Sequence, residues 1–98
     1  MAKFQLQQTK TFSTWYNSIK DIRAKSKIIA RLARMEMGNF GIVKPVGNGV
    51  SETKIDYGPG YRVYFVIRQR KIIVLLCGGN KSTQSVDIET AKILAKEI

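Results

Sequence analysis

The sequence predicts an α+β fold, with an antiparallel sheet of about four to five strands, an N-terminal helical hairpin on one face of the sheet and a short C-terminal helix. Three observations support this prediction. Apolar residues recur at helical spacing between residues 12 and 35, and strand-like alternation replaces that period between residues 43 and 77. A second helical period begins near residue 83. Helices and strands in separate stretches of sequence are typical of this fold class.

The N-terminal segment is expected to form a short strand followed by a helix. Residues 3–8 alternate, with Phe4 and Leu6 on one face. Either Thr9 or Thr11 can cap the helix that follows. The apolar stripe of this helix indicates a face packed in the core, and it consists of Phe12, Trp15, Tyr16, Ile19 and Ile22.

A second helical pattern follows a break near residues 20–21 and ends at Gly38, because glycine accepts the left-handed conformation found after helix C-termini. Its apolar side consists of Ile28, Ile29, Leu32 and Met35, and its basic side of Lys25, Lys27, Arg31 and Arg34. The short turn between the two helices predicts an antiparallel hairpin. The basic side fits either a solvated helix face or a phosphate-binding surface.

The alternating segment predicts a meander of strands at residues 43–46, 50–57, 61–68 and 71–77. Pro45 marks the first of these as an edge strand, since proline cannot donate to a ladder. The last strand is apolar on both faces, so we expect it to lie centrally with both faces covered. Gly78 and Gly79 are expected to break this strand. The final helix would then bury Ile88, Ala91, Leu94, Ala95 and Ile98.

Composition limits the classes of function. The 98 residues predict a single domain, residues 1–98. The chain has no His and one Cys, Cys77, so an imidazole base, an internal disulfide and a Cys-based zinc site are excluded, and we expect no metal or cofactor. The net charge of +10 favours a polyanionic partner. No apolar run approaches the ~20 residues of a membrane span, and the polar N-terminus lacks a signal-peptide core, so a cytoplasmic location is expected.

The densest cluster of functional side chains lies on the predicted meander. Glu52 and Lys54 share one face of a strand, and Arg62 and Tyr64 share one face of the next. If Lys54 lies opposite Arg62, all four side chains converge, whereas a shift of one residue in register separates them. The cluster is equally consistent with cross-strand ion pairs on a solvated sheet and with a working site.

A second candidate lies at residues 78–84, between a strand and the start of a helix. Backbone N–H groups and Lys81 at this position suit an anion. The spacing does not match a P-loop, and a plain turn with a helix cap explains the segment equally well.

One segment resembles a known protein family: Gly58-Pro59-Gly60-Tyr61-Arg62-Val63-Tyr64-Phe65. The similarity extends through residues 38–57 and 75–88 and covers nearly the whole chain from Trp15 onward. These segments resemble the addiction-module killer proteins, the HigB-like branch of the RelE/ParE toxin superfamily. The resemblance implies a RelE-like fold and a bacterial toxin from a type II toxin–antitoxin system.

The resemblance also implies an activity: a ribosome-dependent, metal-independent endoribonuclease that cuts mRNA and inhibits translation. The ribose 2′-OH attacks the adjacent phosphate and leaves a 2′,3′-cyclic phosphate and a 5′-OH. The catalytic positions carried over are Lys54, Arg62, Lys81 and Asp87, and the substrate-binding positions are Glu52, Tyr57, Tyr64, Lys44 and Arg68. Lys54 is the candidate general base, an assignment left open because relatives often carry Arg there. Arg62 would fork onto the scissile phosphate.

Asp87 departs from the RelE pattern, in which a Tyr stacks on the substrate base. A carboxylate cannot stack, so Tyr57 or Tyr64 would have to supply stacking. The implied partners are mRNA on the ribosome and a cognate antitoxin with a helix-turn-helix domain, with DNA contacted only through the antitoxin and no membrane. Two alternatives remain: a ParE-like toxin that inhibits DNA gyrase, and a non-catalytic RNA-binding module. The presence of Lys54, Arg62 and Lys81 favours the nuclease.

Overall fold

The structure is a computed structural model that describes residues 3–98; Met1 and Ala2, part of the predicted domain, lie outside the described residues. In chain order the elements are β1 (Gln5–Gln8), α1 (Lys10–Ser18), α2 (Ile22–Glu36), β2 (Val43–Gly47), β3 (Val50–Ile55), β4 (Tyr61–Arg68), β5 (Ile72–Asn80), the 3-10 turn η1 (Lys81–Thr83) and α3 (Gln84–Glu97). The predicted α+β class is confirmed. Within residues 3–98, no helix has the length and apolar character to cross a bilayer.

The five strands form one sheet in the order β1-β5-β4-β3-β2. Strands β2 to β5 make the predicted antiparallel meander. Strand β1, however, pairs with β5 in parallel, so the expectation of a purely antiparallel sheet is wrong for this edge. Only strands joined by a tight hairpin must run antiparallel. Helices α1 and α2 and strands β2 to β4 separate β1 from β5 along the chain, so this pair can be parallel.

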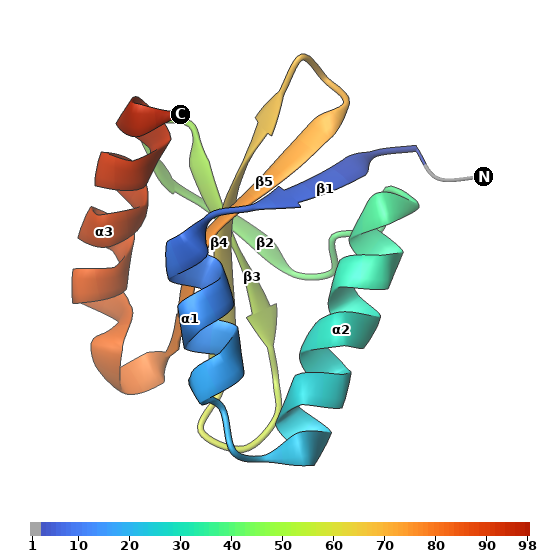
Figure 1. Ribbon diagram of the computed structural model, residues 1–98, viewed down its shortest axis with the longest axis vertical. Coiled ribbons are helices and arrows are strands. Elements are labelled where there is room, and N and C mark those ends of the chain that lie inside the picture. Colours follow the sequence, from blue (N-terminus) through green and yellow to red (C-terminus); the bar gives the residue numbers. More distant parts are fainter. Residues whose placement is uncertain (1–2) are drawn as a thin grey trace.

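Helices cover both faces of the sheet. Helices α1 and α2 pack on one face, and α3 lies on the opposite face (Figure 1). Strand β5 therefore has both faces covered, as predicted, and lies between β1 and β4. The two-sided cover divides the core into two clusters, one on each face of the sheet.

The two N-terminal helices begin at side-chain caps. Thr9 accepts a hydrogen bond from the Phe12 amide, and Asp21 accepts from the amides of Arg23 and Ala24. Since Asp21 caps α2, Ile22 belongs to α2 and not to the stripe of the first helix, and it is 79% exposed. The predicted apolar side of α2 is also too wide, because Ile29 is 51% exposed.

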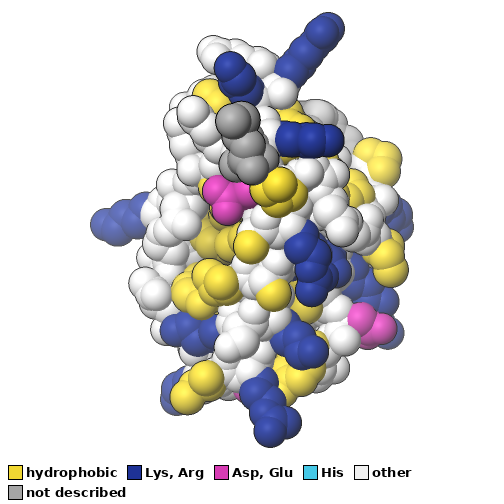
Figure 2. Space-filling model, turned by 90° about the vertical axis from the view of Figure 1, so that its right-hand side faces the viewer, with side chains coloured by type: hydrophobic (Ala, Val, Ile, Leu, Met, Phe, Trp, Pro, Cys, Tyr) yellow, Lys and Arg dark blue, Asp and Glu magenta, His cyan; other side chains and the backbone are white. Residues whose placement is uncertain are grey.

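The basic side of α2 faces outward over most of its length. Figure 2 looks onto this side of the molecule and shows Lys and Arg side chains spread over it with few carboxylates. Lys27 and Arg34 are exposed and Lys25 is half-buried. Arg31 is the exception: it turns inward, and its contacts are described below with the candidate site.

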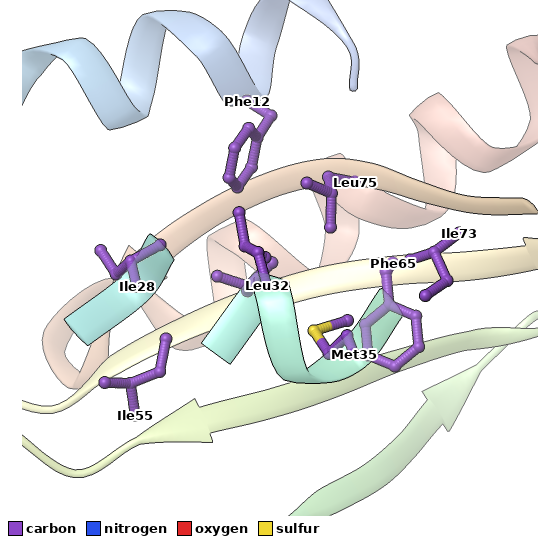
Figure 3. Packing of buried hydrophobic residues seen from close by; sticks show 9 residues of the cluster. Phe12, Ile28, Leu32, Met35, Ile55, Phe65, Ile73 and Leu75 are labelled. Carbon is purple, nitrogen blue, oxygen red and sulfur yellow. The ribbon is translucent and has the colours of Figure 1, made fainter. Parts of the chain in front are cut away.

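The larger core cluster lies between the sheet and the helices α1 and α2. It consists of Phe12, Ile28, Leu32, Met35, Ile55, Val63, Phe65, Ile73 and Leu75 (Figure 3). The smaller cluster lies under α3, which contributes the buried Ala91 and Ala95. Ile98, expected in the same apolar stripe, is 51% exposed because α3 ends at Glu97.

Strand β5 continues to Asn80, so Gly78 and Gly79 do not break it as predicted. Neither glycine takes a left-handed conformation. A Cβ at Gly78 would collide with the ring of Trp15, and one at Gly79 would collide with the carboxylate of Asp87. The absence of a side chain at these glycines therefore lets Trp15 and Asp87 approach the strand closely on its two faces, and the glycines do not form a turn.

Candidate functional site

The register between β3 and β4 places four candidate side chains on the same face of the sheet. Lys54 lies directly opposite Arg62, and Glu52 lies directly opposite Tyr64. Residues two apart on a strand share a face, so all four converge on the face covered by α3. Of the two registers that the sequence left open, the structure adopts the one that brings the cluster together.

Arg62 and Glu52 form a buried ion pair at the centre of this cluster. Arg62 Nε lies 3.2 Å from Glu52 Oε2, and the two side chains are only 10% and 6% exposed. Gln84, the first residue of α3, donates from Nε2 to Glu52 Oε1 at 3.2 Å. The Glu52 carboxylate thus joins two strands to the start of α3, and this arrangement orients the guanidinium of Arg62.

Two donors in the cluster are buried and have no hydrogen-bond partner among residues 3–98: Arg62 Nη1 and Tyr64 Oη. Tyr64 is completely buried, and its burial, with the charges of Glu52 and Asp87, raises the pKa of its hydroxyl far above 10. A buried donor without a partner lowers stability by about 1–3 kcal/mol. Both donors are closed off from solvent on the same face of the sheet.

Asp87 and Lys81 lie at the end of β5, beside this cluster. The carboxylate of Asp87 accepts a hydrogen bond from Thr83 and lies against Gly79, the residue opposite Arg62. Lys81 begins the η1 turn with an exposed side chain, and its amide donates to Gly60 O at 3.1 Å. That bond joins the turn to the loop between β3 and β4.

Three other candidates from the sequence lie in different places. Lys44 is opposite Glu52 on the edge strand, so it lies on the same face as the cluster and is exposed. Tyr57 packs against the other core cluster, on the α2 side of the sheet. Arg68, six residues beyond Arg62 on β4, donates to Ala95 O at 3.0 Å near the C-terminal end of α3. The structure therefore brings Lys44 to the cluster but not Tyr57 or Arg68.

Arg31 is a residue near the site that sequence reasoning placed wrongly. Its Nη1 donates to Thr53 Oγ1 at 2.6 Å, to Lys54 O at 2.9 Å and to Phe40 O at 3.4 Å. Desolvation and then the charge of Arg34 lower its pKa. Arg31 thereby fixes the backbone of the strand that carries Glu52 and Lys54. In the sequence it is one of four cations in a helical stripe, and nothing in that pattern singles it out.

The described residues contain no group of three or more His, Cys, Asp or Glu side chains that could hold a metal ion. The cluster instead combines a guanidinium with a free donor, ammonium groups at its edge, and two carboxylates. Cations of this kind can bind a phosphate and stabilise added negative charge, and carboxylates can accept and return protons.

Cys77 provides a prediction about stability in alkali. Burial and then the charge of Asp87 raise the pKa of its thiol from 9.0 to about 12. A thiol whose folded pKa is raised contributes stability that is complete below pH 9 and is lost as the pH rises toward 12. We expect the free energy of unfolding to fall by about 1.4 kcal/mol between pH 7 and pH 10 on this account. Urea unfolding at both pH values checks it: Cys77→Ala should lose most of this dependence, and an unchanged dependence in that variant would refute the assignment.

Comparisons with known proteins extend these observations. The family described as Phage derived protein Gp49-like (DUF891) matches residues 10–97. An uncharacterized protein of Haemophilus influenzae is 49% identical over 94 residues, which are 96% of this chain and 95% of the relative. Among solved structures, a mutant of the E. coli toxin RelE in the free state is similar with a TM-score of 0.73, 15% sequence identity, and coverage of 100% of this chain and 99% of that chain. The RelE likeness confirms the expected RelE-like fold.

Proposed function

Because the chain belongs to the Gp49-like family of phage-derived proteins and has the fold of RelE, we propose that it is the toxin of a type II toxin–antitoxin system. We further propose that it acts as a HigB-like endoribonuclease, which cleaves mRNA on the ribosome without a metal ion and so inhibits translation.

One observation carries the nuclease proposal: Arg62 is oriented by Glu52 through Nε while its Nη1 lacks a partner among the described residues. A phosphate oxygen that entered beside the buried guanidinium would satisfy that donor. Guanidinium groups bind phosphate through parallel N–H donors, and a fixed donor stabilises the charge that develops as a phosphate is attacked. Lys54 lies directly opposite Arg62, and Lys81 begins the turn that follows β5, so two further cations lie on elements that adjoin Arg62.

The proposed reaction needs two proton transfers, one from the attacking hydroxyl and one to the leaving oxygen. The ribose 2′-OH gives its proton to a base as its oxygen bonds to phosphorus, and the 5′ oxygen takes a proton as it leaves. Lys54 is the base expected from the family. Glu52 is a second candidate, because an ionised carboxylate accepts a proton directly whereas a lysine must first lose one. Lys81 would neutralise the phosphate or the departing oxygen.

The proposed partner is an antitoxin that presents acidic residues. A toxin with a net charge of +10 attracts RNA without selectivity, so we expect it to rest in a complex with that antitoxin. Opposite charge would make the association fast and sensitive to salt.

The test is to incubate the purified protein with translating ribosomes and to map the new ends of the mRNA. We expect cuts that leave a 5′-OH, detected because a kinase labels the downstream fragment without prior phosphatase treatment. A gyrase supercoiling assay runs in parallel. Binding of mRNA without new ends would favour a non-catalytic module, and inhibition of supercoiling without cleavage would favour a ParE-like toxin; either result would overturn the nuclease proposal.

A further inference from the structure

A groove runs along the outer side of α2 and ends at the loop between β3 and β4. Its volume is about 520 Å³, and it is lined by Arg23, Ser26, Lys27, Ala30, Arg34 and Tyr57. We call it the α2 groove. Its three cations are Arg23, Lys27 and Arg34. Lys27 follows Arg23 by four residues and Arg34 follows Lys27 by seven, so all three project from one side of the helix. Ser26 and Ala30 are small and leave room for a ligand between these cations.

The cations of the α2 groove have no carboxylate partners in the part of the chain that the structure describes. The one ion pair within 4.0 Å among those residues is Arg62 with Glu52, on the opposite face of the sheet. No carboxylate lines the groove. Figure 2 shows that Lys and Arg also predominate on the surrounding surface. The groove is therefore a concave, unneutralised positive surface on a chain of net charge +10.

The aromatic ring of Tyr57 lies at one end of the α2 groove. Tyr57 is half-buried, and Lys27 Nζ lies 5.8 Å from the centre of its ring. Cations that contact phosphates, interleaved with a ring that contacts a base, are the combination found in grooves for single-stranded nucleic acid. An acidic peptide would use the charges but has no matching use for the ring.

We propose that the α2 groove binds the phosphodiester backbone of an RNA strand. This extends the proposed function with a second RNA contact, but it concerns binding and does not depend on cleavage. Residues 56–60 connect the two surfaces: Tyr57 lines the groove, and Gly60 O accepts the hydrogen bond from the Lys81 amide beside the candidate site. Figure 1 shows this loop at the same end of the molecule as the turn between α1 and α2. A strand held in the groove can continue around the loop to Lys54 and Arg62.

The experiment measures the affinity of a fluorescein-labelled 12-nucleotide oligouridylate at several NaCl concentrations. The test protein carries Arg23→Gln, Lys27→Gln and Arg34→Gln, which remove three exposed charges and keep good helix formers. Each lost contact with a single-strand phosphate lowers the salt slope by about 0.7, so we expect the slope to fall by about 2. At 100 mM NaCl the affinity should drop on the order of 10-fold or more.

The matched control carries Lys10→Gln, Lys71→Gln and Lys96→Gln, three exposed cations outside the groove. It has the same net charge as the test protein, so it should keep the wild-type slope if the groove is the binding surface. Equal losses in both proteins would overturn the proposal, since they would report general charge alone. Should the test triple fail to fold, as judged by circular dichroism, each single substitution should still lower the slope by about 0.7, and unchanged slopes in all three would overturn the proposal.

Two further measurements distinguish RNA binding in the groove from binding of an acidic protein and from binding at the candidate site. A 12-residue oligoglutamate tests for an acidic protein: if it binds more tightly than the RNA and only the groove triple weakens it, the RNA proposal is overturned. Arg62→Lys tests the link to the candidate site, and it should retain the wild-type salt slope while cleavage becomes slow. If the protein does not cleave mRNA at all but the groove triple still loses RNA binding, the proposed nuclease fails and the groove proposal stands.

Discussion

Replacing Arg62 with alanine is expected to slow mRNA cleavage on the ribosome by about 10²–10³-fold. The guanidinium would stabilise charge that develops on the phosphate during attack, and removing one such donor from other enzymes has an effect of that size. The substitution also leaves the Glu52 carboxylate buried without its ion-pair partner, and breaking a buried pair in this way lowers the free energy of unfolding by about 3–5 kcal/mol. Single-turnover cleavage and urea unfolding measure the two effects separately.

Arg62→Lys separates chemistry from folding. It keeps a cation beside Glu52, so we expect stability near that of the wild type, but lysine cannot present a planar fork to phosphate and cleavage should remain slow. Lys96→Ala removes an exposed charge from the last turn of α3 and should cleave at the wild-type rate. Wild-type cleavage by a folded Arg62→Lys or Arg62→Ala protein would remove Arg62 from the proposed site.

The candidate cluster shows what strand periodicity can and cannot predict. Alternation alone placed Glu52 with Lys54 and Arg62 with Tyr64, because the side-chain period of a strand is fixed. Whether the two pairs share a face depends on the register, and the loop of residues 56–60 permits either choice. In the structure Tyr57 packs on the α2 side, with Ile55, and Tyr64 is completely buried, so neither ring lies ready to stack on a base at the cluster.

Other differences between the predictions and the structure arise where a residue contacts another that is distant in sequence. The pair Gly78 and Gly79 resembles a strand break, but the close approach of Trp15 and Asp87 explains both glycines. The parallel pairing of β1 depends on which edge strand of the meander it joins, β2 or β5, and this choice is not determined by neighbouring residues. By contrast, the Thr9 cap, the edge strand with Pro45 and the meander depend on neighbouring residues, and the sequence predicts them well.

Arg31→Met is expected to lower the free energy of unfolding by about 3 kcal/mol, because hydrogen bonds from a charged donor contribute about 1.5–3 kcal/mol each. The guanidinium of Arg31 joins α2 to Thr53 Oγ1 and Lys54 O. It also packs so closely on Gly41 that a Cβ at Gly41 would collide with Arg31 Cζ. Methionine fills similar volume but leaves these oxygens without their donor. Urea unfolding of the variant measures the loss.

Arg23→Met is the matched control for Arg31→Met, since it removes an exposed cation of the same helix whose side chain donates no hydrogen bond within residues 3–98. Its stability should stay within about 0.5 kcal/mol of the wild type. Arg31 also fixes the backbone at Lys54, directly opposite Arg62, so Arg31→Met should slow cleavage in protein that is still folded. Equal stability of the two variants would mean that the inward-turned guanidinium does not hold β3 in place, and the convergence of Lys54 and Arg62 would then depend on the sheet alone.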